Sequence, residues 1–182
     1  ACRTWRYIGR GGADLRHSAT AFFHAWAAAV DEGRLPIDDV CFEAIGTSYA
    51  EPGRGERTLL PMAEGTMLQS KILESPDRLP FGAAMKMLTE SDVLVVFGSN
   101  DPAYTASKLY PYLLVNKPLL VILHRASPAV EVISRVGGAV CVTFGNEEGI
   151  ESVAEQIKQL WFDSRAFERV CPINLDALER YT

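Results

Sequence analysis

The strongest constraint on the fold comes from residues 93–97, a run of five residues that are all apolar. A strand that is apolar on both faces must be covered on both faces, which is typical of parallel sheets flanked by helices. Residues 119–123 form a second run of this kind. Elsewhere, as in residues 15–30, apolar residues recur at spacings of three and four, which indicates amphipathic helices. The pattern therefore predicts an α/β fold.

Strands and helices are expected to alternate along the whole chain. Strands are expected at residues 5–8, 40–45, 71–74, 93–97, 119–123 and 139–144. Helices are expected at residues 14–30, 81–90, 107–115, 126–135 and 147–161. Such alternation requires parallel pairing with right-handed crossovers. We therefore expect a Rossmann-like three-layer sandwich of about six parallel strands with helices on both faces.

The length of 182 residues fits one ordinary domain. We expect residues 1–162 to form this domain and residues 163–182, which are less periodic, to form a C-terminal segment that leads away from it. Residues 47–65 contain three glycines and two prolines, and we expect them to form a long loop with a short helix near residues 59–64. A loop of this length inside a compact domain is usually functional or mobile.

Charge, hydropathy and cysteine usage exclude several function classes. The net charge of −5, without any basic run, argues against general nucleic-acid binding, because neutralisation of phosphates dominates such binding. No uninterrupted apolar window approaches the roughly 18 residues of a transmembrane helix. The four cysteines, which include no C-x-x-C pair, are Cys2, Cys41, Cys141 and Cys171. We therefore expect neither a metal site nor a disulfide, and a reducing cytoplasm as the setting.

Ligands of such sheets bind at the carboxyl ends of the strands, near the point where the strand order reverses. The first candidate turn consists of Gly9, Arg10, Gly11 and Gly12. Glycines allow backbone amides to approach a phosphate, and Arg10 and Arg16 add two possible anion ligands. Asp14 occupies the third glycine position of the dinucleotide fingerprint, and a Walker lysine is absent. A tight turn with solvated arginines remains the alternative.

Two further turns carry polar side chains. Asn100 begins a turn that ends at Ser107 and Lys108, where free amides and an ammonium group would hold a diphosphate. His124 and Ser127 follow the apolar run at 119–123, and the histidine could titrate near neutrality. The alternatives are a capped helix with an exposed lysine and a structural histidine. The three turns by themselves predict an anion or nucleotide binder, and no catalytic residue is assigned.

Four segments carry a resemblance to a known family. These segments are Tyr7 to Gly12, Ser91 to Val96, Ser107 to Leu113 and Asn116 to Leu120. They resemble the Y-x-G-R, A-D-V-L-V, S-K-L-Y-E-Y-L and G-K-P-V-L motifs of the nucleotide-binding domain of GT-B glycosyltransferases, in particular those of the family 4 type. The resemblance covers about residues 5–162, and the helix motif is its most specific part.

The resemblance implies transfer of a sugar from a nucleotide-diphosphate donor to an acceptor, with no further cofactor. It places the glycine turn, Ser107 and Lys108 beside the diphosphate, and residues 124–127 near the base or ribose. Arg16 lies one position beyond the usual lysine of the family. The chain would then be the C-terminal half of a longer enzyme, inactive by itself, and residues 163–182 would cross to an N-terminal domain. A cytoplasmic location follows, with the inner membrane face as a second option for the full-length protein.

One departure from the family leaves alternatives open. The glutamate pair of the motif E-x7-E falls on Ala103 and Pro111, so both carboxylates are absent. Asn100 or Asp101 could replace the glutamate that binds the ribose. The alternatives are a non-catalytic binding module of the same fold and a nucleotide-sugar epimerase. A further alternative is a nicotinamide-dependent oxidoreductase, which only Glu43, in the second expected strand, supports.

Overall fold

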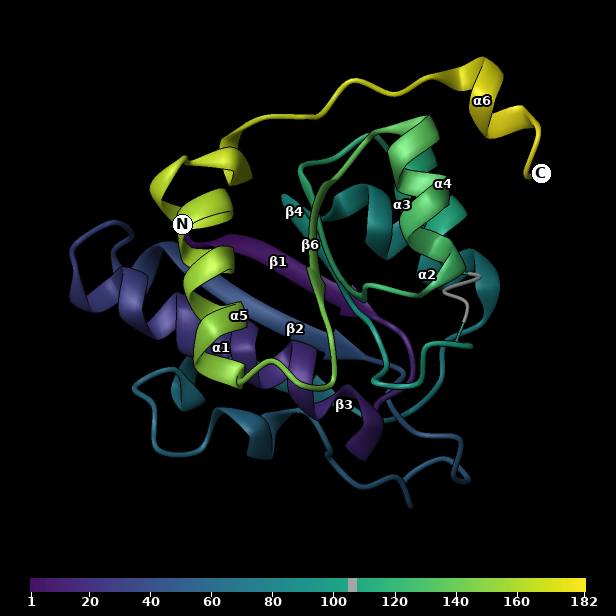
Figure 1. Ribbon diagram of the computed structural model, residues 1–182. Helices are drawn as coiled ribbons and strands as arrows, with labels where there is room; N and C mark the ends of the chain where they lie inside the picture. Colours follow the sequence, from purple (N-terminus) through teal and green to yellow (C-terminus); the bar gives the residue numbers. More distant parts are fainter. Residues whose placement is uncertain (105–107) are drawn as a thin grey trace.

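The computed structural model describes residues 1–104 and 108–182 (Figure 1). Six strands form one parallel sheet in the order β3-β2-β1-β4-β5-β6. They are β1 (Arg3–Ile8), β2 (Val40–Ile45), β3 (Ile72–Ser75), β4 (Val93–Phe97), β5 (Leu119–His124) and β6 (Val140–Phe144). The Rossmann-like fold is thereby confirmed. The strand order reverses between β1 and β4, so the carboxyl ends of these two strands mark the expected ligand crevice.

Helices cover both faces of the sheet. They are α1 (Arg16–Asp31), α2 (Phe81–Glu90), α3 (Leu109–Leu114), α4 (Pro128–Val136), α5 (Ile150–Ile157) and α6 (Leu175–Glu179). In Figure 1, α1 and α5 lie together on one face, and α3 and α4 lie on the other. In residues 1–104 and 108–182, no helix is long and apolar enough to cross a membrane.

The larger of two cores lies between the sheet and the helices α1 and α5. Its centre is Trp5, whose ring lies 5.9 Å from that of Phe162 and 5.5 Å from that of Phe167. Such aromatic side chains bury large apolar areas, and this burial stabilises the α1 face. Phe167 and, in the second core, Leu178 are both buried. The segment 163–182 therefore packs on the domain at these residues, and its crossing to another domain stays a prediction.

The expectation of no disulfide was wrong, because Cys2 and Cys41 are bonded. Cys2 directly precedes β1, and Cys41 lies in the neighbouring strand β2 with a Cα–Cα distance of 6.0 Å, which is ordinary for a disulfide. The two cysteines are 39 residues apart, and strand pairing brings them together. The disulfide therefore removes the basis for expecting a reducing compartment.

Candidate functional site

The turns after β1 and β4 lie side by side at the point where the strand order reverses. The backbone N–H of Asn100 donates to the carbonyl of Asp14 at 2.9 Å. The hydroxyl of Ser18, in α1, donates to the carbonyl of Gly98 at 2.7 Å. These bonds fasten the turn after β4 to the start of α1. The structure therefore brings the first two predicted turns to one edge of the sheet.

The glycine amides of the first turn are engaged within the protein. The N–H groups of Gly9 and Gly11 donate to the carbonyls of Ile45 and Thr47 at 3.0 and 2.7 Å. The N–H of Gly12 donates to Thr58 Oγ1 at 3.1 Å. These three amides do not form an open anion cradle, because the loop after β2 runs directly beside them. At Gly11, a side chain would collide with Thr58.

That loop is held by Glu74, the third residue of β3, whose side chain is only 1% exposed. One carboxylate oxygen accepts from Thr47 Oγ1 at 2.7 Å and from the N–H of Thr58 at 2.9 Å. The other accepts from the N–H groups of Leu59 and Leu60 at 3.0 and 2.7 Å. Thr47 and Thr58 are also the acceptors for the glycine turn, so Glu74 supports that turn through them. A carboxylate within a predicted strand was the available sequence signal, and it was missed.

Arg10 is held by Asp14 and Tyr104. Its guanidinium donates to the two carboxylate oxygens of Asp14 at 2.9 and 2.6 Å. It also lies over the ring of Tyr104, 4.6 Å from the centroid, in a cation–π arrangement. The hydrogen bonds with Asp14 raise the pKa of Arg10 and lower that of Asp14 to about 2. Arg10 is thus charged and oriented, with one carboxylate as its counter-ion.

Lys108, which directly precedes α3, has no such counter-ion among residues 1–104 and 108–182. Its Nζ is buried, and none of the described residues forms a hydrogen bond with it. Burial, together with the charges of Arg78 and Arg10, lowers the pKa of Lys108 to about 8. The side chain passes over Gly9, where a Cβ atom would lie 2.6 Å from Nζ. A side chain at Gly9 would therefore displace the Lys108 ammonium group from its present position.

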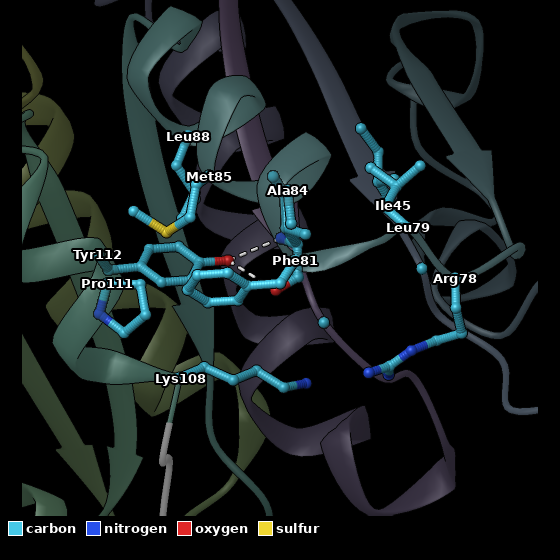
Figure 2. A pocket seen from close by; sticks show the side chains of 13 residues that line it. Ile45, Arg78, Leu79, Phe81, Ala84, Met85, Leu88, Lys108, Pro111 and Tyr112 are labelled. Carbon is cyan, nitrogen blue, oxygen red and sulfur yellow. Dashed lines mark hydrogen bonds between the residues drawn. The ribbon is translucent and has the colours of Figure 1, made fainter.

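Lys108 borders a cavity of about 430 Å³ between α2, α3 and the carboxyl ends of β1 and β2 (Figure 2). In Figure 2, Lys108 and Arg78 point toward one another across its opening. The hydroxyl of Tyr112 accepts from the N–H of Ile8 at 2.7 Å and donates to its carbonyl at 3.0 Å. Pro111, at the position of the second family glutamate, also lines the cavity. The wall at this position is therefore apolar.

The third predicted turn, at residues 124–127, forms hydrogen bonds within the protein. Ser127 caps α4 by accepting from the N–H of Ala129 at 3.3 Å, and its hydroxyl donates to the carbonyl of Tyr104 at 3.1 Å. His124 Nδ1 accepts from the N–H of Ala126 at 3.1 Å. The bond from Ser127 nevertheless joins this turn to the residue on which Arg10 lies. The third turn therefore belongs to the same edge of the sheet.

Three further residues were predicted to bind the ligand, namely Arg16, Asn100 and Ser107. Arg16 is the first residue of α1 and is exposed, as is Asn100, the first residue of the second predicted turn. Ser107 lies outside the described residues. The described part of the chain contains no cluster of three or more His, Cys, Asp or Glu side chains that could hold a metal ion. Sequence reasoning missed Arg78 and Tyr104, which carry no recognisable motif.

Comparisons with known proteins identify the fold. No family model and no curated protein sequence matches the chain. WaaG, a glycosyltransferase involved in lipopolysaccharide biosynthesis, is 12% identical with a TM-score of 0.58, over 98% of this chain and 41% of WaaG. A glycosyltransferase from Rickettsia africae ESF-5 is 15% identical with a TM-score of 0.59, over 98% of this chain and 42% of that structure. A putative UDP-N-acetylglucosamine 2-epimerase from Listeria monocytogenes is 13% identical with a TM-score of 0.52, over 92% of this chain and 38% of that structure.

These comparisons show one half of the GT-B fold. Identities this low establish architecture and leave the substrate open. The chain spans about two fifths of the length of the structures that it matches.

Proposed function

We propose that the chain binds the nucleotide-diphosphate sugar donor of a glycosyltransferase. The observation that carries this proposal is the buried Nζ of Lys108, which has no partner among the described residues. Burying an ammonium group without a counter-ion is costly, and a bound anion would remove that cost. Arg10 presents a second, oriented cation at the same edge of the sheet.

In this proposal the diphosphate lies between Lys108 and Arg10, and side chains replace the glycine amides as its main ligands. Arg10 stays paired with Asp14, which fixes the guanidinium before the ligand arrives. Asp101 Oδ1 already accepts from the N–H of Ala103 at 2.9 Å. Asn100, whose side chain is exposed, is therefore the better candidate for the ribose hydroxyls.

Calorimetric titration of the chain with UDP, GDP and ADP tests the proposal. We expect one of the three diphosphates to bind selectively, as a preformed donor site requires. Absence of binding by all three would contradict a preformed donor site in this chain.

Replacing Arg10 by alanine is expected to weaken binding of the preferred nucleoside diphosphate at least about tenfold, because charge-assisted hydrogen bonds contribute on the order of 1.5 to 3 kcal/mol. The corresponding nucleoside should bind Arg10→Ala and the wild type about equally. Arg54→Ala, which removes an exposed arginine, is the matched control. An equal loss for nucleoside and diphosphate would remove Arg10 from the diphosphate site.

A non-catalytic binding module is the second candidate function. Ala103 and Pro111 favour it, because they remove the two carboxylates of the family motif. Donor hydrolysis or sugar transfer by the full-length protein separates the two candidates. Binding without turnover of any sugar donor supports the module, whereas turnover supports the enzyme.

A further inference from the structure

The cavity beside Lys108 continues the proposed diphosphate site. Lys108 Nζ lies so close to Gly9 that a Cβ atom there would be 2.6 Å away. The hydroxyl of Tyr112 is bonded to the N–H and the carbonyl of Ile8, at 2.7 and 3.0 Å. The ammonium group and the α3 wall of the cavity therefore lie beside consecutive residues at the end of β1. A diphosphate held by Lys108 has one of its two substituents at this cavity.

The walls of the cavity suit the nucleoside of the donor better than its sugar. Ile45, at the end of β2, and Met85 and Leu88, in α2, are among the lining residues. Phe81, the first residue of α2, also lines the cavity and is 74% exposed, so its ring is available for stacking with a base. A hexose would bury several hydroxyl groups against these side chains, at a cost in free energy. The nucleoside is therefore the part of the donor that matches the cavity.

The described lining offers hydrogen-bond donors and no free side-chain oxygen. Its charged side chains, Arg78 and Lys108, can only donate. The one side-chain oxygen is the hydroxyl of Tyr112, which is bonded to Ile8 and belongs to a side chain that is 2% exposed. The backbone carbonyls of Ile8 and Ile45 are also engaged within the protein. A pentose hydroxyl can accept a hydrogen bond here, but its own hydrogen has no side-chain acceptor.

Pro111 forms the wall nearest to the diphosphate. It lies three residues after Lys108, and residues three apart are neighbours on the surface of a helix. Its ring presents only carbon atoms to the cavity, and its nitrogen carries no hydrogen. A carboxylate at this position would supply the missing acceptor. Pro111 therefore leaves an apolar surface where a pentose attached to the diphosphate would lie.

We infer that the donor is a 2′-deoxynucleoside-diphosphate sugar, and that Pro111 makes the site select against the 2′-hydroxyl of a ribonucleotide. The pentose of such a donor has one free hydroxyl, at the 3′ position, where a ribose has two. Asn100, which is exposed at the same edge of the sheet, remains available for the 3′-hydroxyl. This inference rests on the proposed function, because it specifies the pentose of the donor that the site binds.

Calorimetric titration with three matched pairs of ligands tests the inference. The pairs are UDP and dUDP, GDP and dGDP, and ADP and dADP. The members of a pair differ only in the 2′-hydroxyl, so the contributions of base and diphosphate cancel in the ratio of their affinities. For the preferred base, the deoxy form should bind at least about fivefold more tightly, because the 2′-hydroxyl of the other form is buried without an acceptor. Equal affinities, or tighter binding of the ribonucleotide, would overturn the inference.

Pro111→Glu adds an acceptor to the wall and should reverse the preference, so that the ribonucleotide binds at least about fivefold more tightly than the deoxy form. Repulsion between the new carboxylate and the diphosphate is the same for both members of a pair. Leu114→Glu is the matched control, because it adds the same charge to α3 at an exposed residue outside the described lining, and it should keep the deoxy preference. Pro111→Ala, which adds no acceptor, should keep it too. An unchanged preference in a Pro111→Glu variant with the wild-type circular dichroism spectrum would contradict this role of Pro111.

Titration of the wild type with the six diphosphates also separates this inference from the proposed function. If none of the six binds, the proposed donor site is wrong, and this inference is wrong with it. If diphosphates bind without a preference for the deoxy form, the donor site stands and only the inference about the pentose is wrong.

Discussion

Replacing Glu74 by glutamine is expected to lower the free energy of unfolding by about 3 kcal/mol, because a buried donor left without its acceptor costs roughly 1 to 3 kcal/mol. The carboxylate accepts four hydrogen bonds, three of them from the backbone of residues 58–60. Glutamine retains one oxygen and turns an NH₂ group toward two donors. Urea denaturation measures the loss, since its midpoint shifts while its slope stays constant.

Amide hydrogen exchange shows where this destabilisation acts. We expect the amides of Leu59 and Leu60 to exchange faster in Glu74→Gln, and those of Gly11 and Gly12 to follow, because the loop holds the glycine turn. Glu56→Gln, an exposed glutamate in the same loop, is the control and should leave both measurements unchanged. Uniform acceleration across the whole sheet, without a local effect at the loop, would contradict this role of Glu74.

The affinity for a nucleoside diphosphate is expected to fall about tenfold between about pH 7 and about pH 9, because a lysine with a pKa near 8 loses most of its charge over that interval. The protonated form of Lys108 attracts the diphosphate, so binding is strong below the pKa of about 8 and weakens above it. An ordinary lysine, with a pKa of 10.5, would keep its charge throughout this range. Calorimetric titration at a series of pH values measures the decline.

The neighbours of Lys108 do not explain such a decline. Burial raises the pKa of both Tyr7 and Tyr112, so these side chains stay neutral. Arg10 stays charged, because its hydrogen bonds with Asp14 raise its pKa, and a phosphate group completes its ionisation near neutral pH. Lys108→Arg retains the charge and should give a flat profile, whereas Lys108→Gln should bind weakly at every pH. The same pH dependence in Lys108→Arg would show that another group titrates.

Local patterns in the sequence determined the architecture of this protein. The apolar runs at 93–97 and 119–123 became the central strands β4 and β5. The remaining strands were predicted to within one or two residues, because burial on a sheet leaves a pattern within a few neighbouring positions. Arg10 and Lys108 were also predictable as neighbours, because the carboxyl ends of parallel strands meet at one edge.

Tertiary structure alone decided what these residues contact. Glu74 meets residues 14 to 27 positions away, Lys108 lies against Gly9, and Cys2 is bonded to Cys41. Such contacts depend on strand order, register and loop path, which no single segment encodes. The glycine turn therefore indicates an anion cradle when considered by itself, but the loop beside it uses the amides. The apolar cavity and the two cations at its opening likewise exist only because α2, α3 and the ends of β1 and β2 converge there.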